Sequence, residues 1–271
     1  MQGRVLIVAG SDSGGGAGIQ ADIKTVTALG GYAATAITAL TAQNTLGVFD
    51  VFPVDPSFVA AQMEAVLSDI GADAIKTGML FSTPVIQSVA RVCAQWATSI
   101  PIVVDPVMLA KGGHELLLAE ARSALVQDLL PLAALVTPNV PEAEVLSGGM
   151  RITDQEGMSR AADRVLALGA SAVLVKGGHL EGERVYDLLR TADGAEHWFE
   201  SERLLTRATH GTGCTLASAI AAGIADGLTL QHSVERARRY VQDSMRAAPG
   251  FGQGHSPLNH AHVFADKPAS S

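Results

Sequence analysis

Residues 5–18 read VLIVAGSDSGGGAG, an apolar run that passes directly into a glycine-rich loop. The run from Val5 to Ala9 is apolar and rich in β-branched side chains, which predicts a buried strand. The next segment, residues 17–29, places Ile19, Ile23 and Val26 at helical spacing. A buried strand, a glycine loop and an amphipathic helix form the first unit of an α/β domain.

The same alternation continues along the chain. Further short apolar runs lie at 33–42, 72–78, 101–106, 133–139 and 172–178. Between and after them we predict helices near 17–29, 56–69, 83–97, 114–130, 140–147, 155–169, 212–226 and 229–247. Repeated β-α units imply a mostly parallel sheet with helices on both faces. Residues 184–206 differ, because Asp193-Gly194 is typical of the turn of an antiparallel hairpin at a sheet edge.

Composition narrows the class of protein. A chain of 271 residues, 48% of them hydrophobic, suits one large domain, which we place at 1–266 with a frayed tail at 267–271. A net charge of −8 offers no basic stripe, so we expect no nucleic-acid partner. The two cysteines, Cys93 and Cys214, form no disulfide framework, and no apolar stretch is long enough for a membrane span. We expect a soluble cytoplasmic protein.

Polar side chains end four of the predicted strands. They are Lys76-Thr77, Asp105, Thr137 with Asn139, and Lys176. In a parallel sheet the carboxyl ends of the strands meet on one rim, where ligands bind. A polar residue also marks the place where any strand leaves the core, but four such ends together favour a binding site.

The first glycine-rich loop, Gly10 to Gly18, invites a dinucleotide interpretation. Residues 16–21 match G-x-G-x-x-A, but that fingerprint needs an acidic residue about 20 positions later to bind ribose. No Asp or Glu occurs between Asp22 and Asp50, and the Walker lysine is also missing. The loop therefore indicates backbone amides close to a small ligand, or only a tight turn, and a nicotinamide-dependent oxidoreductase is disfavoured.

A second loop, Thr209-His210-Gly211-Thr212-Gly213-Cys214, leads into an apolar helix. Converging N–H groups and the helix dipole at such a position stabilise an anion, although a threonine that only caps the helix is the alternative. A thiol in the first helical turn is expected to have a lowered pKa. Cys93, among Val89, Val92 and Trp96, is expected to be an ordinary buried cysteine.

Seven segments together resemble a known family. The segments are AGSDSGGGAGIQADIKT (9–25), TALTAQNT (38–45), KTGML (76–80), VVDPVMLAKGG (103–113), TPNVPEAEVL (137–146), VKGGH (175–179) and THGTGCTLASA (209–219). They resemble the hydroxymethylpyrimidine and phosphomethylpyrimidine kinases of thiamine synthesis, which belong to the ribokinase-like superfamily. The resemblance runs from about residue 5 to about residue 262.

The resemblance implies a three-layer α/β/α ribokinase-like fold and an enzyme that uses ATP and Mg²⁺. Its expected substrate is 4-amino-5-hydroxymethyl-2-methylpyrimidine, phosphorylated first to the monophosphate and then to the pyrophosphate. A homodimer, formed through edge elements in the first half of the chain, is also implied. Two alternatives stay open: a pyridoxal or pyridoxine kinase, and a ligand-binding homologue without catalysis.

The family's functional residues map onto both loops and the strand ends. On the substrate side the resemblance implies Gly10, Ala17, Asp22, Gln43, Met79 and Val107. Gln43 would hold the aminopyrimidine, because a carboxamide donates and accepts side by side. Asp22 would accept a bond from the substrate hydroxyl or order the first loop. Met79 and Val107 would form apolar walls, with core packing as the alternative.

The phosphate side combines catalytic and nucleotide-binding residues. The resemblance implies Asp105, Asn139, Lys176, Thr209, Gly211, Thr212, Gly213 and Cys214, with Glu142 and Asp105 acting on Mg²⁺ through water. Cys214 would take the proton of the attacking hydroxyl. The spacing of Asn139 and Glu142 by itself predicts a capping box, which is compatible with that role.

One departure concerns the C-terminal stretch. The family pattern G-x-G-x-G-P reads Gly252-Gln253-Gly254-His255-Ser256-Pro257 here, which leaves the local backbone path open. His260 and His262 form an H-x-H pair without a carboxylate cluster, so we expect surface or nucleotide-side residues and no metal site.

Overall fold

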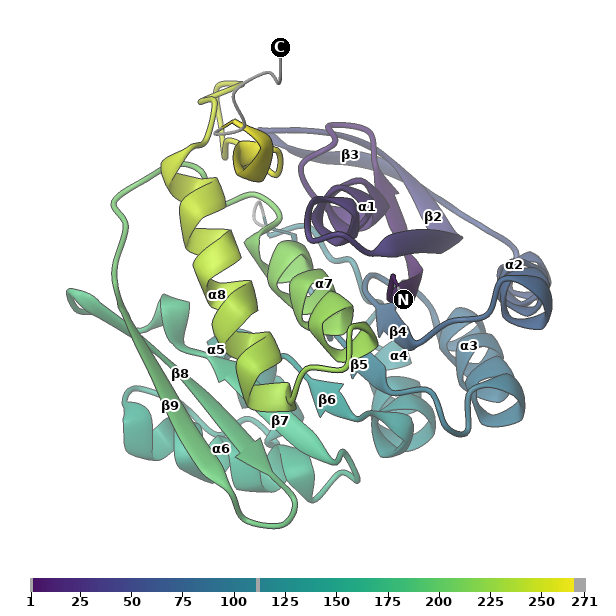
Figure 1. The fold of residues 1–271 in the computed structure, drawn as a ribbon. Helices are drawn as coiled ribbons and strands as arrows, with labels where there is room; N and C mark the ends of the chain where they lie inside the picture. The colour runs from purple at the N-terminus through teal and green to yellow at the C-terminus, as the bar shows by residue number, and fades with distance from the viewer. Residues whose placement is uncertain (1, 111–112, 266–271) are drawn as a thin grey trace.

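The computed structural model describes residues 2–110 and 113–265, and it contains one sheet flanked by helices (Figure 1). The expected tail at 267–271 lies outside the described residues. The strands are β1 (Arg4–Asp12), β2 (Tyr32–Asn44), β3 (Gly47–Pro53), β4 (Ala74–Thr77), β5 (Ile102–Val104), β6 (Leu135–Val136), β7 (Ala172–Lys176), β8 (Arg184–Thr191) and β9 (Glu196–Glu202). In the part of the chain that is described, their order is β3-β2-β1-β4-β5-β6-β7-β8-β9.

The sheet is parallel in its centre and antiparallel at both edges. Strands β2, β1, β4, β5, β6 and β7 pair in parallel. The predicted hairpin is confirmed as β8 and β9, and its turn contains Gly194 at φ 92°. The other edge strand, β3, was not predicted, because its exposed aromatic side chains lack the signal of a buried run.

Helices follow most strands. They are α1 (Gly18–Ala28), α2 (Pro56–Asp69), α3 (Thr83–Trp96), α4 (Ala121–Ala124), α5 (Val140–Leu146), α6 (Gln155–Leu166), α7 (Thr212–Ala225) and α8 (Leu230–Arg246). A π-helical turn, η1 (Leu125–Leu129), and three short 3₁₀ turns, η2 (Leu130–Leu132), η3 (Gly177–His179) and η4 (His262–Phe264), complete the described elements. None of the helices in the described ranges is long and apolar enough to cross a membrane.

The predicted helix at 114–130 is wrong over its first half. The backbone N–H groups of Leu116 and Leu118 donate to the carbonyls of Met108 and Phe81 instead of to positions four residues earlier. The helix starts only at Ala121 and continues as the π-helical turn η1. Tertiary contacts with the loop after β5 therefore override the local helical pattern.

The predicted three layers are confirmed. In the view of Figure 1, α7 and α8 lie in front of the sheet, and α1 packs beside α7 on the same face. Helices α2, α3 and α6 cover the other face. The sheet therefore separates two hydrophobic cores, and strand β1 contributes to each. Val5 and Ile7 pack in the core beneath α1, α7 and α8, whereas Leu6 and Val8 pack in the core beneath α2, α3 and α6.

The topology places a crevice at the carboxyl end of β1. This strand pairs with β2 on one side and β4 on the other, so successive connections leave it in opposite directions. Such a switch point opens a crevice beyond the strand ends, the usual ligand position in an open α/β sheet. The carboxyl ends of β4, β5, β6 and β7 continue the same rim.

Candidate active site

A cavity of about 710 Å³ opens at this rim. Its size lies within the range of small-molecule and cofactor sites. All the predicted site residues except Asp22 line it: Gly10, Ala17, Gln43, Met79, Asp105, Val107, Asn139, Glu142, Lys176, Thr209, Gly211, Thr212, Gly213 and Cys214. The fold therefore brings together residues from both glycine loops and four strand ends.

Asp22 lies below the cavity, within α1, and is fully buried. Its Oδ2 atom lies 2.8 Å from Lys76 Nζ, and its Oδ1 atom accepts a hydrogen bond of 2.7 Å from Ser218 Oγ. Burial raises the pKa of Asp22, although the Lys76 ammonium opposes this. Asp22 does not line the cavity, so the structure places it beneath Lys76 and not among the residues that face a ligand.

Lys76 is the lining residue that Asp22 supports. Burial disfavours its ammonium, but the Asp22 carboxylate prevails and raises the pKa of Lys76 above its ordinary value. The ammonium is fully buried at the end of β4, and a Cβ at Gly78 would lie 2.9 Å from its Nζ atom. Lys76 therefore supplies a fixed positive charge to the floor of the cavity. The sequence showed its place at a strand end but not its partner.

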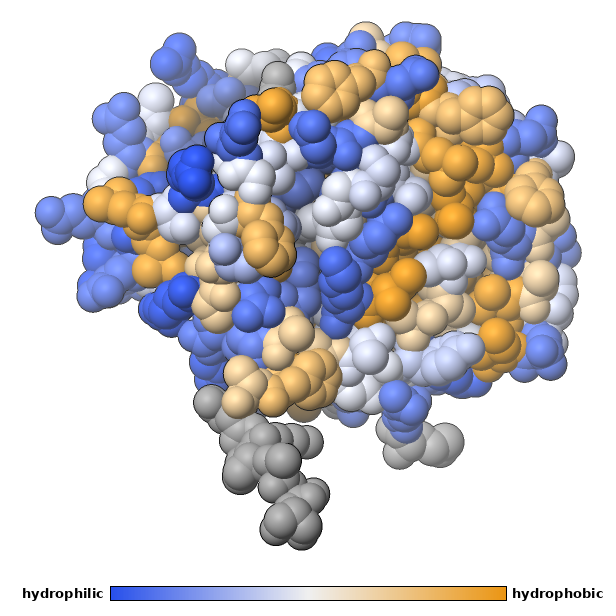
Figure 2. Space-filling model, turned by 90° about the horizontal axis from the view of Figure 1, so that it is seen from above, coloured by the Kyte–Doolittle hydropathy of each residue, from blue (hydrophilic) through white to orange (hydrophobic). Residues whose placement is uncertain are grey.

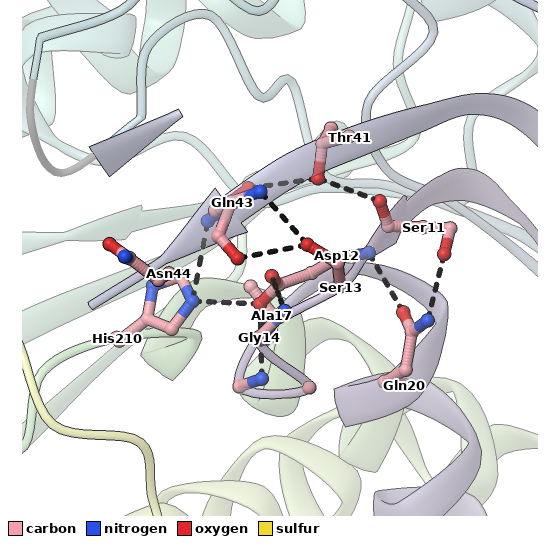
Figure 3. A network of polar contacts seen from close by, with 12 residues as sticks. Ser11, Asp12, Ser13, Gly14, Ala17, Gln20, Thr41, Gln43, Asn44 and His210 are labelled. Carbon is pink, nitrogen blue, oxygen red and sulfur yellow. Dashed lines mark hydrogen bonds and ion pairs between the residues drawn. The ribbon is translucent and has the colours of Figure 1, made fainter. Parts of the chain in front are cut away.

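The first glycine loop wraps around Asp12. The Asp12 carboxylate accepts hydrogen bonds from the backbone N–H groups of Gly14, Gly16 and Ala17 at 2.8, 3.0 and 2.8 Å (Figure 3). Gly18 has φ 54°, and a Cβ there would lie 2.3 Å from the carbonyl oxygen of Gly10. The loop is therefore a closely packed turn around a carboxylate, as the tight-turn alternative predicts, and it also lines the cavity.

The second loop packs directly against the first. Gly211 precedes α7 with φ 81°, and a Cβ there would lie 1.8 Å from the carbonyl oxygen of Gly16. No side chain caps the start of α7, because the Thr212 hydroxyl donates to the carbonyl of Thr209 at 3.2 Å. The first N–H groups of α7 therefore face the cavity without a capping side chain, as an anion site requires.

The structure contradicts the lowered pKa expected for Cys214. Burial raises the pKa of this thiol to about 12, although the Lys76 ammonium opposes the rise. The carboxylates of Asp22 and Asp105 add to it. Desolvation and two nearby negative charges thus outweigh the helix N-terminus. Cys93 is an ordinary buried cysteine, as expected, and burial raises its pKa to about 12.

Lys176 and Asp105 form a charged pair at the centre of the rim. Lys176 Nζ lies 3.0 Å from Asp105 Oδ1, which also accepts from Thr137 Oγ1 at 3.1 Å. A Cβ at Gly213 would lie 3.4 Å from Lys176 Nζ, so the ammonium stands next to the start of α7. Two separate sources of positive charge therefore converge on one point of the cavity.

Asn139 and Glu142 form the predicted capping box. Asn139 Oδ1 accepts from the Glu142 N–H at 2.9 Å, and Glu142 Oε2 accepts from the Asn139 N–H at 2.8 Å. Burial raises the pKa of Glu142 to about 7, although Lys176 opposes this. Among residues 2–110 and 113–265 no group of three His, Cys, Asp or Glu side chains is placed to hold a metal. Two carboxylates, Asp105 and Glu142, suffice for Mg²⁺, because this ion keeps several waters and binds substrate phosphates.

The sequence reasoning missed one end of the cavity. This end is lined by α8, the β8–β9 hairpin and the segment after it, including Val185, Leu204, Val241, Gln242 and Met245. Val241 and Met245 are four positions apart on α8, a spacing that core packing and a ligand-facing surface share. The apolar side chains at this end stand among polar and charged ones, Asp187, Ser201, Glu202, Arg203 and Arg238.

The C-terminal stretch accommodates Ser256. This residue is buried, its carbonyl accepts from the His210 N–H at 3.3 Å, and its N–H donates to the Arg207 carbonyl at 3.0 Å. His260 is not a surface residue, because it is buried and its Nε2 atom lies 2.9 Å from Thr215 Oγ1. Its neighbour His262 contacts the Tyr240 ring.

The phosphomethylpyrimidine kinase family model matches residues 12–259. The chain belongs to this family. It is 54% identical over 266 residues to the thiamine biosynthesis bifunctional protein ThiED of Geobacter sulfurreducens, covering 98% of this chain and 54% of that protein. It is 46% identical to the hydroxymethylpyrimidine/phosphomethylpyrimidine kinase of Rhizobium meliloti, covering 95% of this chain and 96% of the relative.

The kinase also resembles solved structures over almost its full length. The ADP complex of Bacillus subtilis pyridoxal kinase superimposes with a TM-score of 0.90 at 35% identity, covering 98% of this chain and 100% of the other. The fold is ribokinase-like. The chain spans about half of the bifunctional relative and nearly all of the Rhizobium meliloti kinase.

Proposed function

We propose that this kinase transfers the γ-phosphoryl group of ATP to the hydroxymethyl group of 4-amino-5-hydroxymethyl-2-methylpyrimidine, and then phosphorylates the monophosphate, in thiamine biosynthesis. The supporting observation is one cavity that joins an amide side chain and apolar walls to an uncapped helix N-terminus with a neighbouring lysine. The names of the relatives, which share 46 to 54% of their aligned residues with this chain, support the same substrate.

The substrate half of the cavity suits a flat, polar-edged ring. Gln43 offers a donor and an acceptor side by side, as an aminopyrimidine edge requires. Met79 and Val107 line the same cavity as apolar walls. A Cβ at Gly10 would lie 2.9 Å from Met79 Sδ, so Gly10 leaves the space in which Met79 approaches the first loop.

The phosphate half of the cavity neutralises the negative charge of the phosphoryl group during its transfer. The hydroxyl oxygen of the substrate attacks the γ-phosphorus while the bond from that phosphorus to the ADP oxygen breaks. The N–H groups at the start of α7 and the ammonium of Lys176 stabilise the charge that spreads over the transferred group. Mg²⁺ would add positive charge on the phosphates, and Asp105 and Glu142 would hold it through water. Cys214 stands beside the reacting hydroxyl, orients it, and accepts its proton in the thiolate form.

Pyridoxal phosphorylation is the second candidate function. The observation in its favour is the TM-score of 0.90 with Bacillus subtilis pyridoxal kinase. Pyridoxal also carries a hydroxymethyl group on a nitrogen-containing ring. Its ring has no amine beside the ring nitrogen, so the Gln43 carbonyl oxygen would lack the hydrogen-bond donor that the aminopyrimidine provides.

The deciding experiment measures ADP release from Mg²⁺-ATP with each acceptor. We expect kcat/KM for the aminopyrimidine to exceed that for pyridoxal by at least roughly tenfold, because the loss of one well-formed hydrogen bond changes binding by about that factor. A second equivalent of ADP should follow with the monophosphate, and EDTA should abolish both steps. A preference for pyridoxal would favour the second candidate, and no ADP from folded protein would identify a ligand-binding homologue.

A homodimer and a cytoplasmic location complete the proposal. Seen from above, apolar residues form a broad band on the right of the molecule (Figure 2). Leu40 and Phe52, which face each other across β2 and β3, are 46% and 69% exposed. An uncovered edge strand with exposed aromatic side chains favours association with a second copy. Two free cysteines suit a reducing compartment in which ATP is present.

A further inference from the structure

Asp12 and His210 form a buried pair that the proposed mechanism does not use. Asp12 ends β1 and is 3% exposed, and His210 lies in the second loop and is 9% exposed. The Asp12 Oδ2 and His210 Nε2 atoms are 2.8 Å apart, although the residues are separated by 198 positions (Figure 3). The pair therefore links the two glycine loops beside the substrate half of the cavity.

The hydrogen of His210 lies on Nε2. Burial opposes ionisation of Asp12, but the His210 hydrogen bond and the backbone N–H groups of Ala17 and Gly14 hold its pKa below the ordinary value. An ionised carboxylate has no hydrogen to donate, so the imidazole must be the donor in the 2.8 Å contact. This holds for the neutral and for the charged ring.

The ring has little freedom to turn. A Cβ at Gly16 would lie 2.4 Å from His210 Cδ2 and 3.0 Å from Pro257 Cβ. The first loop thus closes over the imidazole, and the absence of a side chain at Gly16 makes room for it. Packing and the Asp12 bond together fix the direction of the Nε2 hydrogen.

That direction decides the orientation of the Gln43 carboxamide. Gln43 has its amide nitrogen 3.4 Å from His210 Nε2 in Figure 3, which would face two donors toward each other. Its amide oxygen lies 3.3 Å from Thr41 Oγ1, but the single Thr41 hydroxyl hydrogen goes to the Ser11 carbonyl at 2.9 Å. Rotation of the carboxamide by half a turn places the Gln43 oxygen beside the Nε2 hydrogen, which Asp12 and Gln43 then share in a three-centre bond. The rotated Gln43 N–H can donate to the Thr41 hydroxyl oxygen.

We propose that the Asp12–His210 pair is a specificity device, which holds the Gln43 oxygen toward His210 and the Gln43 nitrogen toward Thr41. After these two contacts the carboxamide keeps one oxygen lone pair and one N–H for a ligand. This pattern matches a heteroaromatic ring whose amine lies on the His210 side and whose ring nitrogen lies on the Thr41 side. The inference rests on the proposed aminopyrimidine substrate.

The activity test compares His210→Phe with His210→Gln. His210→Phe keeps a flat ring but removes the donor, so Gln43 can turn and the KM for the aminopyrimidine should rise about tenfold. The kcat, the KM for ATP and the kcat/KM for pyridoxal should change less than about threefold. His210→Gln restores an N–H near the same position and should recover most of the loss. His232→Phe, at an exposed site on α8, is the matched control.

Equal losses for both acceptors, or a fall in kcat alone, would overturn the proposal. A direct measurement serves if His210→Phe does not fold: in the wild-type protein, NMR contacts from the Gln43 amide hydrogens should reach Thr41 side-chain hydrogens. Contacts to the His210 ring hydrogens instead would refute the orientation. If the wild type phosphorylates no aminopyrimidine, the proposed function fails while the NMR result still decides the orientation.

Discussion

Cys214 shows how strongly one residue depends on its surroundings. It stands in the first turn of α7, which lowers a thiol pKa, but the side chain is half-buried and lies near the carboxylates of Asp22 and Asp105. Burial prevails and raises the pKa to about 12. At neutral pH the thiol is therefore protonated in the unliganded kinase. The thiolate that would accept a proton is a minor species whose population rises with pH.

This protonation state gives a testable pH dependence. Below a pKa of about 12, each pH unit increases the thiolate fraction tenfold, so kcat should rise steadily between about pH 8 and 9.5, above the pKa of about 7 to which burial raises that of Glu142. Cys214→Ala should remove that rise and lower kcat by roughly 100-fold, the lower end for a positioned base. Cys93→Ala removes another buried thiol with a similar pKa and should leave the profile unchanged. A flat wild-type profile, or near-normal turnover in Cys214→Ala, would leave the helix N-terminus as the main catalytic element.

At the scale of elements, the two glycine loops act as one unit. The carbonyl of Gly16 occupies the space that a side chain at position 211 would need, and the His210 ring occupies the space beside Gly16. The start of α7 therefore depends on the path of the loop after β1. The two loops are far apart in sequence, and their contact sets the position of the N–H groups that face the phosphate.

A pair of glycine variants tests this dependence. Gly211 and Gly227 have similar φ values, 81° and 84°, but a Cβ at Gly227 meets no atom within 4 Å. Gly227→Ala should lose about 1 kcal/mol of unfolding free energy through backbone strain, measured by urea denaturation. Gly211→Ala should lose more, because its Cβ also clashes with the Gly16 carbonyl. Only Gly211→Ala should also lose at least roughly 100-fold in kcat/KM, because the loops must move apart. Equal activity in the two variants would show that the loop contact does not position the site.

At the scale of the whole molecule, the two edges of the sheet differ. The β8–β9 edge belongs to the cavity wall, whereas the β3 edge presents exposed aromatic side chains. Phe49, Phe52 and Phe58 are each more than 60% exposed, and they lie on β3 and the helix that follows it. Charged residues would protect such an edge from association, and aromatic residues invite it.

The proposed homodimer is tested by sedimentation of the wild type and of Phe52→Asp. A buried charge at position 52 would lack a partner, so the variant should sediment as a monomer while the wild type sediments as a dimer. Leu205→Asp is the control, since Leu205 is 97% exposed and lies beyond the other edge, after β9. A monomeric wild type, or a dimer that tolerates Phe52→Asp, would exclude this interface.

Much of the fold follows from local sequence patterns. The succession of strands and helices, the hairpin turn at Asp193-Gly194 and the capping box of Asn139 and Glu142 were predicted, because each depends on residues close in the chain. The helix predicted at 114–130 was wrong over its first half, since the backbone bonds there depend on distant segments such as Phe81. The strand at 47–53 was missed although it forms a local hairpin with β2, because its exposed aromatic side chains lack the pattern of a buried run. The rim of polar strand ends was also predicted, because parallel strands carry their carboxyl ends to one side.

The sequence by itself determined the α/β order, the two glycine loops and the set of polar residues on one rim, because spacing and turn chemistry act locally. Only the tertiary structure decided which of these groups meet. It paired Asp12 with His210 and Lys76 with Asp22, placed Asp22 outside the cavity lining, and raised the pKa of Cys214. The physical reason is that burial and contacts between distant segments set desolvation, charge and hydrogen-bond direction, and no local pattern carries that information.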